Sequence, residues 1–221
     1  MIMDYLTTDM FTKALRHVCD LVISSEPMLT ELDNIVGDGD HGDGMRDGFT
    51  ELKSVLGEDV TFPNLHELTR TTGMALVKSM GGASGVIFGT MFIGGHDAVV
   101  AEDGSYLDKL DAGGIRRFFR ASADAISRRG RAKANDRTML DALLHAVDAM
   151  EQSGTNDVVQ LLKEGWEGAC RGVEATKQML PRLGRSKNFR THVLGYPDPG
   201  AVSTSIIFQG LYEAVSRINV Q

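Results

Sequence analysis

The sequence predicts an all-α protein, a bundle or barrel of about eight or nine helices. Apolar residues recur three or four positions apart along most of the chain, which is the spacing of one helix face. No segment alternates convincingly with a period of two, and no tight Asn-Gly turn joins β-branched runs, so we expect little sheet. The chain has 221 residues and no Pro/Ser-rich linker, which predicts a single domain over residues 1–221.

Five helices are expected in the first half of the chain. Each is marked by apolar residues at helical spacing and ends near glycine or before a polar loop. They run from Phe11 to Val22, from Pro27 to Ile35, from Met45 to Leu56 before Gly57, from Leu65 to Leu76 before Gly81 and Gly82, and after Ser84 through Val86, Ile87, Met91 and Phe92.

Four helices are expected in the second half. They run from Ile115 through Ile126 to Gly130, from Thr138 to Gln152, from Asp157 to Leu180 and from Ala201 to Ile218. We expect the residues that carry chemistry to lie in the connections at residues 33–44, 80–85, 129–138 and 181–200.

Composition narrows the classes of partner. The formal net charge is −7 and the pI is near 5.3, so we expect no nucleic acid and no anionic membrane as a general partner. The N-terminus lacks a basic region followed by an apolar core, and the long uncharged stretch from Ser79 to His96 is rich in glycine. Cys19 and Cys170 are isolated and are interpreted as small buried residues. These features predict a cytoplasmic protein whose partners are proteins and small molecules.

Asp33, Asp38 and Asp40 place three carboxylates within eight positions of a Gly-rich segment. Crowded carboxylates disfavour one another's ionisation unless a cation lies between them, and oxygen ligands alone favour Mg²⁺ or Ca²⁺. An EF-hand that begins at Asp38 fails, because Asp43 stands where a glycine is required and Phe49 stands where a glutamate should close the loop. Mg²⁺ with a phosphate as a further ligand is favoured, and a solvated acidic turn is the alternative.

Other connections suggest phosphate binding more weakly. Gly81-Gly82-Ala83-Ser84-Gly85 precedes an apolar helix whose N-terminus could receive a phosphate, although close helix packing explains it equally well and no Walker motif is present. The basic segment 128–137 fits a phosphate clamp or a solvated loop, with Asp136 or Thr138 as the helix cap. Asp198 is most simply a cap, and His41 could contact phosphate, orient a carboxylate or be an ordinary polar residue.

Together these segments resemble the nucleotide-binding L subunit of dihydroxyacetone kinases. The resemblance spans nearly the whole chain and is carried by four motifs in the same order and at similar spacing: Asp33 with Gly37-Asp38-Gly39-Asp40-His41-Gly42, Gly81-Gly82-Ala83-Ser84-Gly85, Asp136-Arg137-Thr138-Met139-Leu140-Asp141 and Asp198-Pro199-Gly200-Ala201. It implies an antiparallel eight-helix barrel with a nucleotide site at one end.

The resemblance also implies roles for individual residues. Asp33, Asp38 and Asp40 would hold Mg²⁺, expected as two ions, and would act in catalysis through the metal without a protein nucleophile. The remaining residues would surround the phosphates or line the pocket of ADP or ATP: His41, Gly42, Gly44, Ala83, Ser84, Gly130, Thr138, Met139, Arg185, Asp198 and Gly200. Gly44 departs from the family pattern, where many relatives carry Asn or Thr, so only a backbone N–H remains there for phosphate.

In this family a separate K subunit holds the ketose, and this chain has no second domain for that task. We therefore expect a K-subunit partner and a phosphoryl donor from the phosphotransferase system that recharges bound ADP. Two alternatives stay open: an ATP-dependent two-subunit kinase for a tetrulose such as erythrulose, and a nucleotide-loaded regulator of a transcription factor. A homodimer is also left open.

Overall fold

The computed structural model describes residues 2–184, 187 and 190–219. Nearly all of the regular structure in these residues is helical, as predicted. The nine α-helices are α1 (Thr8–Ser24), α2 (Glu26–Val36), α3 (His41–Val55), α4 (Leu65–Ser79), α5 (Gly82–Ile93), α6 (Ala112–Gly130), α7 (Met139–Gln152), α8 (Val158–Thr176) and α9 (Pro199–Ile218).

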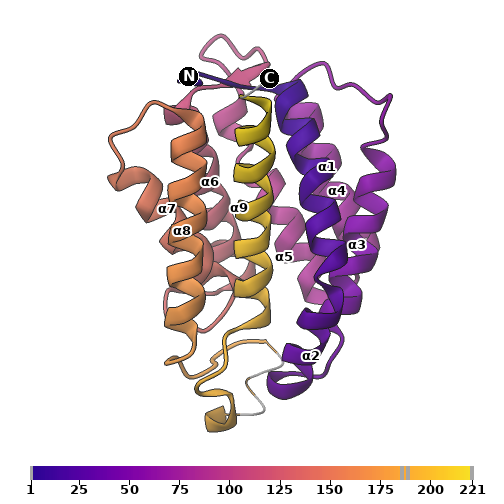
Figure 1. Ribbon diagram of the computed structural model, residues 1–221, viewed down its shortest axis with the longest axis vertical. Helices are drawn as coiled ribbons and strands as arrows, with labels where there is room; N and C mark the ends of the chain where they lie inside the picture. The colour runs from indigo at the N-terminus through magenta and orange to yellow at the C-terminus, as the bar shows by residue number, and fades with distance from the viewer. Residues whose placement is uncertain (1, 185–186, 188–189, 220–221) are drawn as a thin grey trace.

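Eight of these helices form a closed ring. From α3 onward each helix packs against the next one in sequence, α1 packs against α3, and α9 closes the ring by packing against α1. The short α2 lies across one end and contacts α3 and α9 (Figure 1). The prediction of an antiparallel eight-helix barrel is thus confirmed, with α2 as the ninth helix outside the ring.

Successive helices of the ring run in opposite directions. Both chain termini lie at the same end, and α2 marks the opposite end (Figure 1). Consequently α3, α5, α7 and α9 all begin at the α2 end, whereas α1, α4, α6 and α8 begin at the end of the termini. This alternation determines which helix N-termini can share a site.

The sheet is small, as expected. Strand β1 (Leu6–Thr7) pairs antiparallel with β2 (Lys109–Leu110), with Leu6 opposite Leu110. Short 3-10 helices lie at η1 (His96–Val99) and η3 (Arg190–Val193). Apart from η3, these pieces lie near the end of the termini, away from the connections predicted to carry chemistry.

Side-chain caps define most helix starts. Thr7, Asn64, Asp111, Asp157 and Asp198 each accept a hydrogen bond from a backbone N–H of the first turn. Thr138 caps α7 in a reciprocal capping box with Asp141. The sequence left Asp136 and Thr138 open as caps of this helix, and the cap is Thr138.

The predicted end of α8 was too late. The helix ends at Thr176, not at Leu180. The Thr176 hydroxyl accepts a hydrogen bond from the Asp198 backbone N–H at 2.9 Å, and the Gly195 N–H donates to the Lys177 carbonyl at 2.9 Å. Contacts with the segment before α9 therefore replace the next helical turn.

The ring interior is packed with aliphatic and aromatic side chains. Phe118 contacts Phe11 and Phe119 edge to face, and Phe119 lies against Phe208. Cys19 is fully buried, and burial raises the pKa of its thiol to about 12, whereas Cys170 is only half-buried. Among the described helices, none combines the length and apolar character needed to cross a membrane.

Candidate functional site

A cavity of about 420 Å³ opens at the α2 end of the barrel. Its walls come from five stretches of the chain. They are the end of α2 with the following loop and the start of α3, the start of α5, the C-terminal part of α6 with the following loop and the start of α7, residues 183–184, and the start of α9. The four connections that the sequence marked for chemistry are therefore adjacent in space.

Eleven of the fourteen predicted site residues line this cavity. They are Asp33, Asp38, Asp40, His41, Ala83, Ser84, Gly130, Thr138, Met139, Asp198 and Gly200. Gly42 and Gly44 are not part of its lining, and Arg185 lies outside the described residues.

The two glycines that lie outside the cavity have other surroundings. Gly42 is buried where α3 crosses α2, and an added Cβ would overlap the Thr30 hydroxyl oxygen. The Gly44 N–H donates to the Asp40 carbonyl at 3.0 Å within the first turn of α3, so it is already engaged. Contact of Gly44 with a phosphate therefore stays a prediction, and its N–H already has a partner within the helix.

The three aspartates form a compact acidic cluster. Each offers one carboxylate oxygen, and these oxygens lie within 4.8 Å of one another. Asp33 is buried, whereas Asp38 and Asp40 are exposed on the cavity side. A set of carboxylate oxygens with neither nitrogen nor sulfur fits Mg²⁺, which takes few protein ligands and completes its shell with water and phosphate oxygens.

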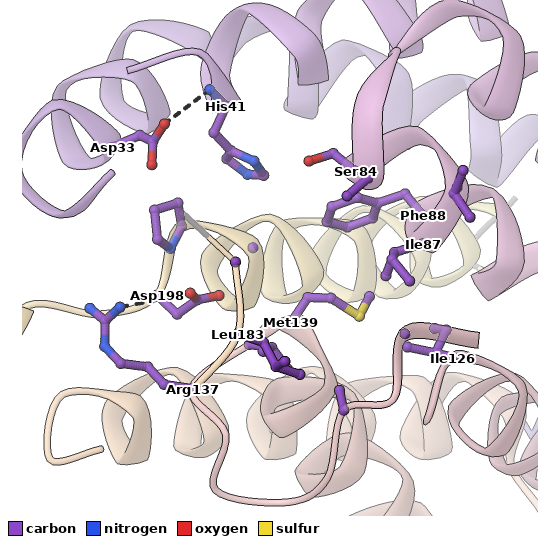
Figure 2. Close-up of a pocket in the computed structure, with 18 of the residues that line it drawn as sticks. Asp33, His41, Ser84, Ile87, Phe88, Ile126, Arg137, Met139, Leu183 and Asp198 are labelled. Carbon is purple, nitrogen blue, oxygen red and sulfur yellow. Dashed lines mark hydrogen bonds and ion pairs between the residues drawn. The ribbon is translucent and has the colours of Figure 1, made fainter. Parts of the chain in front are cut away.

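Asp33 also shapes the loop that carries the other two acids. Its Oδ2 accepts hydrogen bonds from the Gly39 N–H at 3.0 Å and from the His41 N–H at 3.1 Å (Figure 2). Gly37 must be a glycine because a Cβ there would overlap Asp33 Oδ1, and Gly39 has a φ of +81°. The glycines of this loop thus allow the chain to wrap around one buried carboxylate.

His41 is held in place by α9. Its Nε2 lies 2.8 Å from the Ser203 hydroxyl, and its ring centre lies 6.2 Å from that of Phe88. Burial lowers the pKa of His41, so the neutral imidazole is favoured. The ring borders the cavity beside the acidic cluster (Figure 2).

Four helix N-termini converge on the cavity. His41 begins α3, Ala83 and Ser84 lie in the first turn of α5, Met139 begins α7, and Pro199 begins α9. The chain enters α5 through Gly81 and Gly82, whose φ values are +66° and +55°. Because each N-terminus carries partial positive charge and backbone N–H donors, the alternation of the barrel creates an anion-binding end.

The opposite wall of the cavity is apolar. Figure 2 shows Ile87 and Phe88 on α5 facing Ile126, Met139 and Leu183 across the opening. Except for Met139, sequence reasoning did not assign these residues to the site. For Ile87 and Phe88 the only signal was the almost wholly apolar composition of the helix after Ser84, which predicted burial.

Asp198 serves both as a cap and as part of the cavity wall. Its Oδ1 accepts a hydrogen bond from the Ala201 N–H at 2.9 Å and so caps α9. The carboxylate also lines the cavity, and burial raises its pKa to about 6 against an opposing effect of Arg137. The two interpretations of Asp198 from sequence are thus compatible.

Arg137 is the principal polar residue that sequence reasoning did not place in the site. Its side chain is fully buried, lines the cavity and lies next to Asp198 (Figure 2). The basic segment 128–137 left a phosphate clamp and a solvated loop open, and an arginine ahead of a helix is usually exposed, so burial of Arg137 in particular was not predicted.

An eight-helix barrel whose helix N-termini surround an acidic cluster defines a helical domain built to bind an anion beside a divalent cation. Residues 35–213 match the model of the DAK2 domain, and the chain belongs to this family.

Relatives with similar sequences cover most of the chain. It is 33% identical over 198 residues to the PEP-dependent dihydroxyacetone kinase, ADP-binding subunit DhaL, of Escherichia coli K12, which covers 87% of this chain and 90% of that protein. It is 32% identical over 204 residues to the corresponding subunit of dihydroxyacetone kinase 1 from Listeria innocua, with coverage of 90% and 94%.

Solved structures of a larger relative share the fold. The dihydroxyacetone kinase of C. freundii superposes in its native form with a TM-score of 0.71 at 27% identity, over 91% of this chain and 34% of that one. Its complex with AMP-PNP and Mg²⁺ also gives 0.71, at 25% identity, over 96% and 35%. The chain thus corresponds to about a third of that kinase.

Proposed function

We propose that this protein is the ADP-binding subunit of a dihydroxyacetone-type kinase and transfers a phosphoryl group to a ketose held by a separate K subunit. The observation that carries the proposal is the meeting of three aspartates and four helix N-termini around one cavity. Such a site offers carboxylates for a cation and N–H donors for phosphates at the same place.

In this proposal Asp33, Asp38 and Asp40 hold Mg²⁺, two ions being expected. When bound, the metal offsets the charge that develops on the phosphoryl group during transfer. The chain positions the donor: the starts of α3 and α5, with His41, Ala83 and Ser84, bind the phosphates. No nucleophilic side chain is required, because positioning and charge stabilisation supply most of the catalysis in this reaction class.

In this proposal the apolar wall of the cavity binds the base of the nucleotide. Ile87, Ile126 and Leu183 border a space suited to a flat base, and Gly130, Thr138, Asp198 and Gly200 line the same cavity. The volume of about 420 Å³ is within the range of small-molecule sites. Arg185 stays a predicted residue of the nucleotide site.

We further propose a source for the phosphoryl group. Relatives named as PEP-dependent ADP-binding subunits cover the chain almost end to end, which supports ADP that is recharged by a phosphotransferase-system protein. An ATP-dependent kinase for a tetrulose is a second candidate, supported by 27% identity to the D-erythrulose kinase of Mycolicibacterium smegmatis over 92% of this chain and 35% of that protein.

The test is to release and identify the nucleotide from the purified protein by mass spectrometry, and then to combine the protein with its K partner and dihydroxyacetone. Tightly held ADP with turnover that depends on a phosphoenolpyruvate-driven donor supports the proposal. An exchangeable site with turnover on ATP supports the second candidate. Absence of both nucleotide binding and turnover would contradict both.

A further inference from the structure

Arg137 is a buried cation in the wall of the cavity. Its side chain is fully buried, and it lies just before the Thr138 cap of α7 with a φ of 61°. A non-glycine residue in this left-handed region is uncommon, and such strain is retained where the surrounding structure requires it. We therefore expect the Arg137 side chain to have a specific role.

One edge of the guanidinium holds the segment that precedes α9. Nη2 donates to the carbonyls of Tyr196 at 3.0 Å, Pro197 at 3.3 Å and Val193 at 3.4 Å. This segment leads directly into Asp198, the N-cap of α9 and a residue of the cavity wall. Arg137 thus joins the start of α7 to the start of α9.

Another arginine, Arg116, binds loop carbonyls in a similar way and provides a comparison. Arg116 donates from Nε to the Met150 carbonyl at 2.7 Å and from Nη2 to Ser153 at 2.9 Å and Thr155 at 2.6 Å. It uses two nitrogens for three carbonyls and lies away from the cavity, between α6 and the connection after α7. A guanidinium that only anchors a loop can therefore distribute its donors over the loop.

Arg137 does not distribute its donors in this way. Its Nε and Nη1 have no hydrogen-bond acceptor among the described residues, although both are buried. The nearest charge is Asp198 Oδ2, which lies 3.9 Å from Nη1, beyond hydrogen-bond distance. Unsatisfied buried donors on a charged group are costly, so they are expected where a ligand or a nearby carboxylate uses them.

We propose that Arg137 is a positioning residue of the nucleotide site, which holds the segment 193–197 in place and keeps the Asp198 carboxylate turned toward the nucleotide. The inference rests on the proposed function. Arg137 would raise the affinity for the nucleotide through its effect on Asp198. This role goes beyond the loop anchoring that Arg116 provides between α6 and the connection after α7.

The electrostatic surroundings of Asp198 support this assignment. The charged groups that act on it are Arg137 and Asp141 from the start of α7 and Asp33 from the end of α2, and His41 from α3 reaches Ser203 nearby on α9. Both aspartates raise the pKa of Asp198, and Arg137 alone among these groups lowers it. Without Arg137, Asp198 would be protonated over a wider range of pH.

The experiment measures the affinity for ADP in the presence of Mg²⁺ by isothermal titration calorimetry, with melting temperatures recorded in parallel. The variants are Arg137→Met, Arg137→Lys and Arg116→Met, each in the wild-type chain and in an Asp198→Asn background. Arg116→Met is the matched control because it removes an arginine that binds three loop carbonyls outside the cavity. Arg137→Lys retains the charge in case Arg137→Met does not fold.

We expect Arg137→Met to weaken ADP binding about tenfold or more, Arg137→Lys to recover part of that loss, and Arg116→Met to leave affinity within about twofold at a comparable loss of melting temperature. In the Asp198→Asn background the effect of Arg137→Met should shrink to about twofold. Unchanged affinity in both Arg137 variants, an equal loss in Arg116→Met, or an undiminished loss beside Asp198→Asn would overturn the inference. If the wild-type chain binds no nucleotide, the proposed function fails and the inference fails with it.

Discussion

At the residue scale, the three aspartates differ in what surrounds them. Asp33 is buried and has two backbone donors on Oδ2, whereas Asp38 and Asp40 are exposed toward the cavity. Removal of Asp33 would therefore disturb the loop as well as the metal, so the test of metal binding uses the exposed Asp38.

We predict that Asp38→Ala abolishes Mg²⁺ retention and lowers phosphoryl transfer by about 100-fold or more, because a ligand that offsets charge in the transition state is lost. The helical circular-dichroism signal should persist. Asp43→Ala is the control, since Asp43 is an exposed acid on the same segment that pairs with Arg46 outside the cavity. Metal analysis and transfer rates check the pair, and equal activity of both variants would exclude the metal assignment.

A second prediction concerns Asp198 and pH. Its pKa is raised to about 6 in the folded protein from an ordinary 3.8, so the folded state holds this proton more tightly than the unfolded chain does. The contribution of Asp198 to the unfolding free energy therefore falls as pH rises from about 4 to about 6, by on the order of 2 kcal/mol. Asp198→Asn keeps a capping carbonyl oxygen but no titrating proton, so this decrease should disappear.

Urea denaturation at pH values from 4 to 7 measures the effect. Asp157→Asn is the matched control, because it makes the same exchange at the N-cap of α8, away from the cavity. The account of Asp198 is contradicted if the Asp198→Asn protein keeps the wild-type decrease, or if Asp157→Asn removes it.

The sequence predicted the acidic cluster and the glycine junction well, because both are local patterns with a direct chemical meaning. The resemblance extended this to His41, Thr138 and Asp198, which also line the cavity. Arg137 and Ile87 were not predicted as site residues. Tertiary packing decides whether a charged side chain is buried and which way an apolar helix faces. Neither property can be predicted from the spacing of residues along the chain.

At the element scale, the helices follow from apolar periodicity and caps, and all nine were predicted. The late end assigned to α8 shows where this reasoning stops, because the helix ends through contacts with residues about twenty positions further along the chain. The two glycines at the start of α3 illustrate the same point: their residue types are identical, and only packing separates their roles.

We predict opposite effects of alanine at these two glycines. At Gly42 an added Cβ would lie 2.6 Å from the Glu26 carbonyl oxygen and the Thr30 nitrogen, which are backbone atoms, so α3 must move away from α2. Gly42→Ala should lower the unfolding free energy by about 1–3 kcal/mol. At Gly44 the nearest atom is 3.7 Å away, so Gly44→Ala should raise it by up to about 1 kcal/mol through helix propensity.

Denaturant unfolding of the two variants against the wild type provides the measurement. Both replacements change helix propensity alike. The difference between the unfolding free energies of the two variants therefore measures the effect of the packing of α3 on α2. Equal stability of the two variants would mean that Gly42 is not in close contact with α2.

At the scale of the whole molecule, the antiparallel ring gathers helix N-termini at the end of the barrel where we propose that the phosphates bind. Eight helices with alternating direction place four N-termini at the α2 end, and the loop wrapped around Asp33 adds the acidic cluster at the same end. The sequence indicated the number of helices, and the resemblance supplied the closed ring. Helix spacing alone could not have shown that α1 and α9 meet.

The central claim is that Mg²⁺ and nucleotide occupy this end together. Calorimetric titration of ADP into nucleotide-free protein, with Mg²⁺ and then with EDTA in its place, tests it most directly. The account predicts one nucleotide per chain with Mg²⁺ and a loss of affinity of about 100-fold or more with EDTA, because the carboxylates then repel the phosphates. Equal affinity with and without Mg²⁺, or no binding in either case, would contradict it.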